Sequence, residues 1–466
     1  MKGTCSMQVP GEQWALAQWG EVALGDRRLS RRAVAMGERM LAHPAGSLPQ
    51  QMHSRAELKG AYALLKNPRV THERLQSPHW QATRAATAGE GVALMIQDLS
   101  ELDYTPYAQT LSGLGPIGDG RGHGLLLHST LAVLPQSGRV LGLAHQQIAL
   151  RVPTPQGTKR RQRPPQERES RLWGQGVKAL GSPPPGVRWV LVADRAADQT
   201  ALWVQTAQQM DFVIRASYEH RLLDPSPEAA YLLSTARQWP AQAEEHLCLQ
   251  ATPKRKARQA HLRISFGRVE IRTSRKRDAP GLPLWAVRIW EPEPPPGAEA
   301  VEWILVTSLR CESVEQARQI IAWYTSRWLI EDYHQCLKSG CAVERRDLEE
   351  RERIERLLGF LAIVAVRLLQ LRQEARIEPE QPATQVAPAV AVHLVAARLK
   401  QDPAHLTAHQ FWRGVARLGG FLGRRGDGEP GWKTLWRGWL EVEAWMRGIE
   451  LASRAALLDR PAPTYG

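Results

Sequence analysis

The sequence predicts an α/β protein whose central part alternates strands and helices between two helical ends. Two apolar runs, residues 92–98 and 187–194, each end in an aspartate and have the length and composition of buried strands. The stretch 92–217 alternates such strands with helical segments. Residues 12–68 and most of the chain beyond 354 carry helical periodicity instead. We therefore expect an α/β core with a helical region on either side.

The amino-terminal region contains a strongly basic predicted helix. Asp26 is placed to cap a helix over residues 27–41, because its side chain can accept a backbone hydrogen bond from the first turn. Four arginines then recur at helical spacing on one side: Arg27, Arg28, Arg31 and Arg32. An ordinary surface helix explains this pattern as well as a nucleic-acid contact does.

The central region begins with further strands and a glycine series. Residues 125–134 and 140–150 predict a strand pair, and 166–180 and 198–209 predict helices. The glycines at 118, 120, 122 and 124 precede a strand, so they lack the helix amino terminus with which nucleotide loops bind phosphate. The chain also has no Gly-x4-Gly-Lys-Ser/Thr sequence. We expect a turn at these glycines and no nucleotide cofactor.

A segment of strand character separates the second apolar run from a later one. Residues 247–289 alternate apolar and basic residues, which indicates strands, and residues 303–306 predict a further buried strand. We expect a β insertion at about 225–300, and a Pro-rich basic loop at 153–165. The final helices carry an aromatic stripe, which is typical of a core: Trp432, Trp436, Trp439 and Trp445.

Residues 324–338, taken as one helix, separate their side chains by chemistry. At about 100° per residue, one arc of roughly 60° contains Tyr324, Arg327, Glu331 and Lys338. The opposite side is apolar and contains Leu329, Ile330, Tyr333, Cys336 and Leu337. A carboxylate flanked by a phenol and two cations suits a divalent ion next to bound phosphates.

Two other acids have contexts that fit Glu331. Asp98 and Asp194 each end an apolar run, where a carboxylate is well placed to hold a cation at a sheet edge. A single aspartate at a strand end is more often a turn or cap residue. Three such acids, one of them within a basic face, favour a shared metal site with Asp98, Asp194 and Glu331 as ligands. Hard divalent cations prefer oxygen ligands of this kind.

The spacing Tyr-x2-Arg-x3-Glu-x6-Lys of residues 324, 327, 331 and 338 resembles the signature of the bacterial DDE transposases of the insertion-sequence four family. Further blocks along nearly the whole chain resemble that family, including Gly60-Ala61-Tyr62, Asn67-Pro68, Gly120-Arg121-Gly122, His128-Ser129, Asp194-Arg195 with Asp198, and Thr307-Ser308. One departure follows Asp98, where Leu99 stands in place of the usual threonine. It removes a hydroxyl beside the expected metal site.

The resemblance implies an RNase H-like catalytic core with a β-strand insertion. It also implies three domains: a helical transposon-end-binding domain over 1–70, the core over 71–372, and a helical dimerisation domain over 373–466. The reaction implied is cut-and-paste transposition within a synaptic homodimer, through nicking, hairpin formation, hairpin opening and strand transfer. The partners are transposon-end and target double-stranded DNA.

The roles of individual residues follow from the same resemblance and from phosphodiester chemistry. Two Mg²⁺ ions, for which Mn²⁺ can substitute, are expected on the three acids. Terminal phosphates and the displaced strand are expected to contact Arg215, Tyr324, Arg327 and Lys338. Trp303 and Trp328 offer planar faces to a flipped base, with core packing as the alternative for each. Further DNA contacts are expected at Lys254, Arg255 and Lys256 and at the arginines of 27–32.

The net charge and the cysteine content agree with the prediction of a DNA-binding bacterial enzyme. A formal net charge of +14 favours a polyanionic partner. The five cysteines are scattered, which predicts reduced core thiols and no zinc site at Cys336 and Cys341. The sequence shows no signal-peptide pattern and no apolar run of membrane-spanning length, so we expect a cytoplasmic, nucleoid-associated bacterial protein without membrane contact.

Two other functions fit parts of the sequence. One is a metal-dependent nuclease that has the same core but does not transpose. The other is a catalytically dead DNA-binding inhibitor of transposition. The presence of all three acids argues against the inhibitor, and the basic amino-terminal helix and Trp-rich carboxy-terminal region argue against a bare nuclease.

Overall fold

The structure is a computed structural model of the chain. It describes residues 11–153, 164–223, 230–249, 258–274, 280–424 and 427–458. The described residues form two compact units. We call Trp80–Gln136 with Leu141–Glu331 the sheet unit, and Met1–His79, Ser137–Val140 and Asp332–Gly466 the helical unit. The predicted DNA contacts Lys254, Arg255 and Lys256, and most of the predicted loop at 153–165, lie outside the described residues.

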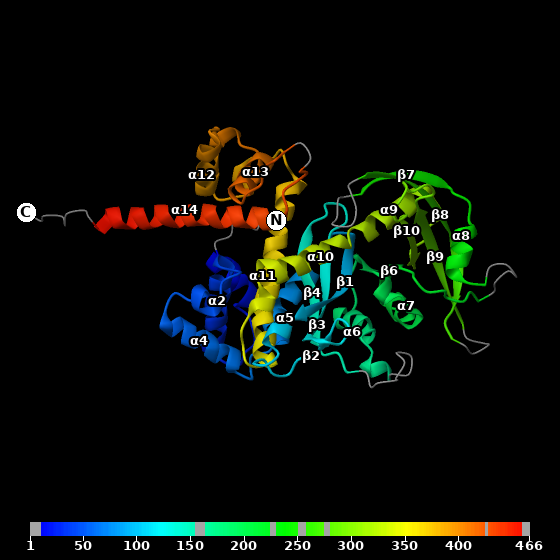
Figure 1. Cartoon of the computed structure of the whole chain (residues 1–466), viewed down its shortest axis with the longest axis horizontal. Coiled ribbons are helices and arrows are strands. Elements are labelled where there is room, and N and C mark those ends of the chain that lie inside the picture. The colour runs from blue at the N-terminus through cyan, green and yellow to red at the C-terminus, as the bar shows by residue number, and fades with distance from the viewer. Residues whose placement is uncertain are drawn as a thin grey trace, which may run out of the picture. The chain divides into compact units, whose positions relative to one another are not determined.

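Within the described residues, the sheet unit is built on a ten-stranded sheet (Figure 1). Its strands are β1 (Val92–Asp103), β2 (Gly115–Ile117), β3 (Gly122–Val133), β4 (Val140–Ala149), β5 (Arg188–Ala193), β6 (Asp211–Arg215), β7 (Ala243–Leu249), β8 (Arg258–Arg272), β9 (Gly281–Trp290) and β10 (Glu302–Thr307). Their order is β2-β3-β1-β5-β6-β10-β9-β8-β7, with β4 paired to β3. The pairs β1–β5 and β5–β6 are parallel, whereas β1–β3 and β6–β10 are antiparallel.

The strand predictions are confirmed, and the strands of the predicted insertion belong to the central sheet. Strands β7, β8 and β9 lie within the predicted insertion, and β9 pairs with β10 in register from Glu302↔Trp290 to Thr307↔Trp285. The insertion therefore extends the central sheet. The first two glycines of the series form the turn between β2 and β3, where Gly118 and Gly120 have φ values of +58° and +97° that other residues adopt rarely, while Gly122 and Gly124 lie in β3.

Helices cover both faces of the sheet. On one face, α6 (Arg171–Leu180), α7 (Thr200–Ala207) and α8 (Leu232–Gln238) bury Trp173, Trp203 and Leu232 in a core that also contains Met95 and Trp189. Helix α9 (Val314–Thr325) contacts β5, β6 and β9, and its buried residues Ala317 and Ile320 lie outside that core. Because side chains alternate along a strand, β1 directs Met95 and Gln97 to the first face and Ile96 and Asp98 to the second.

The prediction of one helix over residues 324–338 is wrong. Helix α9 ends at Thr325, and α10 (Trp328–Gln335) starts after a turn at Ser326 and Arg327. A π-helical turn, Cys336–Gly340, then follows. The predicted apolar side is nevertheless largely correct, since Leu329 is half-buried and four residues are fully buried: Ile330, Tyr333, Cys336 and Leu337.

The break after α9 has a local chemical cause. The hydroxyls of Thr325 and Ser326 both donate to Ala322 O, at 2.7 and 3.2 Å, and so compete with the helical bonding pattern. The backbone then tightens, because Arg327 N bonds Tyr324 O three residues back, at 3.0 Å. A helical-wheel projection that assumes 100° per residue cannot represent this turn.

Short helices form the amino-terminal part of the helical unit: α1 (Gly11–Trp19), α2 (Arg27–Ala42), α3 (Leu48–Gln51), α4 (Arg55–Lys66) and the start of α5 (His72–Ala85). The predicted cap is confirmed, since Asp26 Oδ1 accepts from Arg28 N at 2.8 Å. Arg356 of α11 (Arg351–Ile377) donates to Leu65 O and Val70 O, both at 2.7 Å. These bonds hold the amino-terminal helices against α11.

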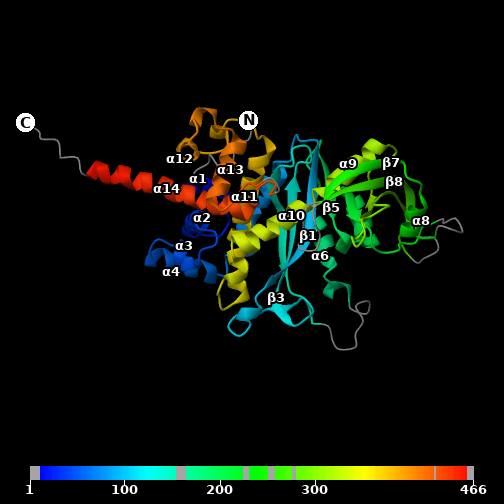
Figure 2. The same cartoon turned by 45° about the horizontal axis from the view of Figure 1, so that its top comes forward.

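The carboxy-terminal part contains α12 (Ala389–Leu399), α13 (Ala408–Leu418) and the long α14 (Trp432–Leu458), a single rod in Figure 2. The core prediction for the aromatic stripe is confirmed for Trp432, Trp436 and Trp439, which are buried, while Trp445 is half-buried. Cys311, Cys336 and Cys341 are buried free thiols, as expected. No helix among those described is long and apolar enough to cross a membrane.

Close packing at Gly37 makes a stability prediction. A Cβ added to this α2 glycine would overlap the ring of Trp19, which is fully buried. We expect Gly37→Ala to destabilise the helical unit by about 1–3 kcal/mol, as overpacking does. Gly448→Ala is the matched control, because Gly448 lies in an exposed part of α14, a Cβ there meets nothing within 4 Å, and alanine favours helix by about 1 kcal/mol. Thermal unfolding distinguishes the two; equal melting temperatures for both variants would contradict the packing argument.

Candidate active site

The first two candidate acids occupy neighbouring strands of the sheet unit. The parallel register between β1 and β5 ends at Gln97↔Ala193, so Asp98 and Asp194 occupy the next position on each strand. Adjacent strands lie about 4.8 Å apart. Asp194 follows β5 directly and caps a short 3-10 helix, Arg195–Ala197, by accepting from Ala196 N at 2.8 Å. Asp98 differs from the expectation of a strand end, because β1 continues to Asp103 beside β3.

The environment of Asp98 opposes its negative charge. Burial is the main cause, followed by repulsion from Asp194, and together they raise the pKa of Asp98 to about 7. Leu99 N donates to Asp98 Oδ1 at 2.8 Å and, with the charge of Arg327, offsets part of this effect. The side chain of Asp98 is 18% exposed. A divalent cation bound to both Asp98 and Asp194 would reduce the repulsion between the two carboxylates.

Arg327 connects Asp98 with Glu331. Its Nη2 lies 2.6 Å from Glu331 Oε1, and its Nη1 lies 4.0 Å from Asp98 Oδ2. Burial would lower the pKa of Arg327, but the charges of Glu331, Tyr324 and Asp98 more than compensate, so the pKa is raised. Arg327 Nε is buried and makes no hydrogen bond within the described part of the chain. Arg327 thus neutralises charge among the acids.

The acids do not form a closed metal site in this conformation. Among the described residues, no group of three or more His, Cys, Asp or Glu side chains is placed to hold a metal ion. Glu331 is instead bound to Arg327, although its charge still contributes to raising the pKa of Asp98. The all-oxygen donor set fits a hard divalent cation. In this conformation Arg327 donates to one oxygen of Glu331, Oε1.

Tyr324 brings two further predicted residues to the same site. It is 5% exposed, and its ring lies edge-on to Trp303 with centroids 5.3 Å apart. Burial raises the pKa of Tyr324, while the charges of Arg327 and Arg215 lower it and that of Asp194 raises it. The hydroxyl therefore lies within the field of both cations and of Asp194. Arg215, at the end of β6, also donates from Nη2 to Glu302 O at 3.1 Å.

The two predicted base-stacking residues differ in exposure. Trp303 is half-buried against Tyr324, so packing accounts for part of its surface. Trp328 is 57% exposed at the start of α10, and the guanidinium of Arg327 lies 5.1 Å from its ring centroid. Core packing is therefore wrong for Trp328. Its ring offers a free face beside the acids.

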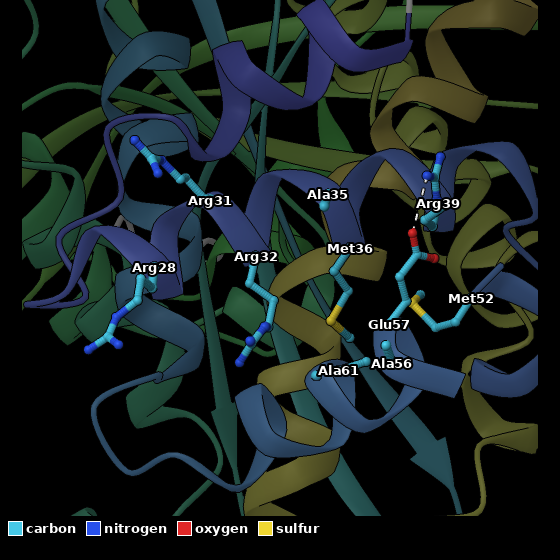
Figure 3. Close-up of a pocket in the computed structure, with 11 residues that line it drawn as sticks. Arg28, Arg31, Arg32, Ala35, Met36, Arg39, Met52, Ala56, Glu57 and Ala61 are labelled. Carbon is cyan, nitrogen blue, oxygen red and sulfur yellow. Dashed lines mark hydrogen bonds and ion pairs between the residues drawn. The ribbon is translucent and has the colours of Figure 1, made fainter. Parts of the chain in front are cut away.

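The remaining predicted contacts lie in the helical unit. Lys338 is in the π-helical turn, where its Nζ lies 3.3 Å from Glu344 Oε1. Arg27, Arg28, Arg31 and Arg32 are all exposed on α2. Three of them, Arg28, Arg31 and Arg32, line a groove between α2 and α4 whose floor includes Met36 and Met52 (Figure 3). At one end of the groove, Arg39 Nη2 lies 3.4 Å from Glu57 Oε1, the pair joined by the dashed line in Figure 3.

One buried carboxylate near this site received no role from the sequence. Asp198 lies four residues after Asp194 and is 3% exposed, with hydrogen bonds to the segment that follows β6. The sequence contained one signal, the block Asp194-Arg195 with Asp198. That block could not show which groups the carboxylate binds.

Three family models match the chain. They are Transposase DNA-binding over residues 11–70, Transposase DDE domain over 183–367, and Transposase Tn5 dimerisation domain over 363–456. The fold and the matches define a DDE transposase, a metal-dependent polynucleotidyl transferase with an RNase H-like core. Within that class, the chain belongs to the Tn5-type enzymes of the insertion-sequence four family.

The matched ranges support the predicted class of protein, its DNA-binding and dimerisation domains and its dependence on metal. The chain is a DNA transposase, with DNA-binding and dimerisation domains, and its family depends on divalent metal. Asp194 and Glu331 lie inside the matched DDE domain, whereas Asp98 lies outside all three matched ranges. The assignment of individual residues to metal and DNA stays a prediction.

Proposed function

We propose that this transposase works by cut-and-paste transposition: it nicks DNA at the ends of its element, forms and opens hairpins, and joins the freed ends to target DNA. One observation supports this most strongly. Asp98 and Asp194 take adjacent positions on β1 and β5, and Arg327 connects the first of them to Glu331. This arrangement supports the proposal that the three acids and Arg327 act together on a scissile phosphate.

The acids are proposed to hold two Mg²⁺ ions. When bound, such ions stabilise the charge that develops on a phosphodiester during displacement and activate the attacking oxygen. Arg327 lies between Glu331 and Asp98. With cations on the acids, its guanidinium would be available to the phosphate, for which a planar fork of donors is well suited.

Other residues around the acids are proposed to orient the DNA. The charges of Arg215 and Asp194 both act on the Tyr324 hydroxyl, so these groups lie near one another. Arg215 and Tyr324 can therefore hold the phosphate that follows the scissile bond. The exposed ring of Trp328 is suited to stacking on a base taken out of the helix, and Trp303 supports Tyr324 from the side. The α2 arginines are proposed to bind the transposon end.

We also propose the three-part division into an end-binding domain (1–70), a catalytic core (71–372) and a dimerisation domain (373–466). The model matches at 11–70 and 363–456 support the first and last parts. A homodimer would then bring together two transposon ends for coupled cleavage.

Lys338 gives a prediction about salt dependence. If it binds a DNA phosphate after leaving Glu344, Lys338→Ala should weaken end binding at every sequence and lower the slope of log K against log salt by about one. Titration of end binding over a series of salt concentrations measures this slope. Lys178→Ala, at an exposed position of α6, is the control. An unchanged slope in Lys338→Ala would remove the residue from the DNA interface.

A cleavage assay tests the proposed function. The purified chain is incubated with Mg²⁺ and a DNA fragment carrying the sequences that flank its gene, with Glu331→Gln as the inactive control. Hairpin-ended excised DNA supports cut-and-paste transposition. Plain cuts would indicate a nuclease with the same core, and a shifted but uncut fragment would indicate an inhibitor.

A further inference from the structure

Asp198 is a charged side chain that the protein buries close to its candidate acids. The side chain has no exposed surface, and no basic side chain other than His220 is ion-paired with it in the described residues. A buried carboxylate is costly unless hydrogen bonds satisfy its oxygens. The bonds that Asp198 makes therefore indicate what it stabilises.

All of these bonds lead to one short segment after β6. Asp198 Oδ2 accepts from Ser217 N at 2.6 Å, from Tyr218 N at 2.8 Å and from Ser217 Oγ at 3.3 Å. Asp198 Oδ1 lies 2.5 Å from His220 Nε2. The other ring nitrogen of His220 lies 3.2 Å from Thr200 Oγ1, which fixes the ring on α7.

Other contacts hold the two ends of the segment: Ala216 N donates to Ile304 O at 2.8 Å, and the His220 ring packs against Trp203 with centroids 4.4 Å apart. Ser217, Tyr218 and Glu219 are exposed, and the large side chain of Tyr218 is 61% exposed. Apolar burial therefore does not anchor these three residues. Glu219 bonds outward to α8, through Leu233 N at 3.0 Å and Ser234 Oγ at 2.7 Å. The connection inward, to the turn that carries Asp194, is made by Asp198.

The position of this connection relates it to the reaction. Asp198 ends the short helix that Asp194 begins, so the two acids bracket one rigid turn. The segment it holds starts two residues after Arg215, whose charge acts on Tyr324 together with that of Asp194. The strands themselves pair up to Ala193↔Ile214, and Asp198 adds a second connection between the segments that follow them, next to Asp194 and Arg215.

We propose that Asp198 is a positioning residue, which through its hydrogen bonds to residues 217–220 keeps Arg215 at a fixed distance from Asp194 during phosphate displacement. This rests on the proposed cleavage activity. Asp198 acts through geometry and does not bind metal or DNA, so its charge is dispensable while its hydrogen bonds are not.

Replacing Asp198 by asparagine removes the charge and keeps the hydrogen-bonding groups. The amide oxygen of Asp198→Asn can accept the bonds from Ser217 and Tyr218, and its NH₂ can donate to His220 Nε2. His220 then donates from Nδ1 to Thr200 Oγ1, so every group stays paired. Asp198→Ala removes all of these acceptors and leaves two backbone N–H groups without them.

The test compares single-turnover cleavage and end binding in the two variants. We expect Asp198→Asn to cleave within about threefold of wild type, and Asp198→Ala to cleave about 10–100-fold more slowly, because a small displacement of a positioning group has effects of this size. End-binding affinity should change little in either. Glu291→Ala is the matched control, since Glu291 is a buried carboxylate paired with Arg258 in the same unit. It should lower the melting temperature without slowing cleavage.

Several results would overturn the proposal. Asparagine as slow as alanine would make the charge essential, and alanine as fast as wild type would remove any role. Parallel loss of folding, end binding and cleavage in Asp198→Ala would reduce its role to stability, and then His220→Ala decides, since it removes one bond from a partly accessible site. Unchanged cleavage in His220→Ala would end the proposal. Wild-type protein that cleaves no DNA is a different result, which counts against the proposed function itself.

Discussion

Asp194→Asn and Glu331→Gln are each expected to lower the cleavage rate by at least about a thousandfold, because each removes an anionic ligand from ions that stabilise the transition state. Both substitutions preserve side-chain size, so the fold should survive. End binding should also persist, because the exposed arginines of α2 lie on a separate structural unit. Single-turnover cleavage and a gel-shift assay on the same DNA measure the two effects separately.

Asp211→Asn provides the control for this pair. Asp211 begins β6 and is partly buried, with Ser308 Oγ donating to its Oδ1 at 2.8 Å. It lies at the opposite end of β6 from Arg215, so its charge should not affect cleavage. Near-normal cleavage by Glu331→Gln would show that this carboxylate is not a metal ligand.

The second large effect concerns the Mg²⁺ concentration that cleavage requires and its dependence on pH. The pKa of Asp98 is raised to about 7, so below pH 7 a cation that binds this carboxyl must displace a proton. The Mg²⁺ concentration for half-maximal cleavage should therefore rise by up to about tenfold for each pH unit below 7, and level off above it. Metal titrations of cleavage between pH 5.5 and 8.5 check this. A demand independent of pH would contradict the raised pKa.

The same shift predicts a stability effect with a definite sign. A folded-state pKa of about 7, against the ordinary aspartate value of 3.8, means that the unfolded chain binds fewer protons between these values. Stability of the metal-free protein should thus fall as pH rises through this window. Asp98→Asn should raise the melting temperature at pH 8, by about 2–4 °C for each kcal/mol relieved, and change it little near pH 4. A lower melting temperature at pH 8 would point to a stabilising charge instead.

Local signals allowed much of the fold to be predicted from the sequence. The apolar runs at 92–98 and 187–194 are β1 and β5, and the cap at Asp26 forms as expected. Each of these depends on neighbours along the chain. The break after Thr325 also has a local cause, but hydroxyl bonds to Ala322 O are one option among several for Thr and Ser, so periodicity alone does not reveal them.

Contacts between distant segments could not be predicted in this way. The sequence assigned Arg327 to DNA phosphate, whereas in the metal-free protein it binds Glu331 and lies 4.0 Å from Asp98. Likewise, Lys338 is paired with Glu344. The hydrogen bonds of Asp198 form because the pairing of β6 with β5 brings the segment after β6 to the turn after β5. The contacts of Arg327 with Asp98 and of Asp198 with the segment after β6 depend on strand order, which no single stretch of sequence contains. The Arg327–Glu331 and Lys338–Glu344 pairs are local, but the sequence alone does not show that these cations bind a carboxylate rather than a phosphate.

Asp98, Asp194 and Glu331 are proposed to share divalent ions. Replacing Mg²⁺ by Fe²⁺ in the presence of ascorbate and peroxide tests it directly, because radicals formed at the bound iron cut the nearby backbone. We predict cuts close to all three residues, suppressed by excess Mg²⁺ and lost in Glu331→Gln. Cuts near residues 98 and 194 alone, unchanged in Glu331→Gln, would contradict the shared site.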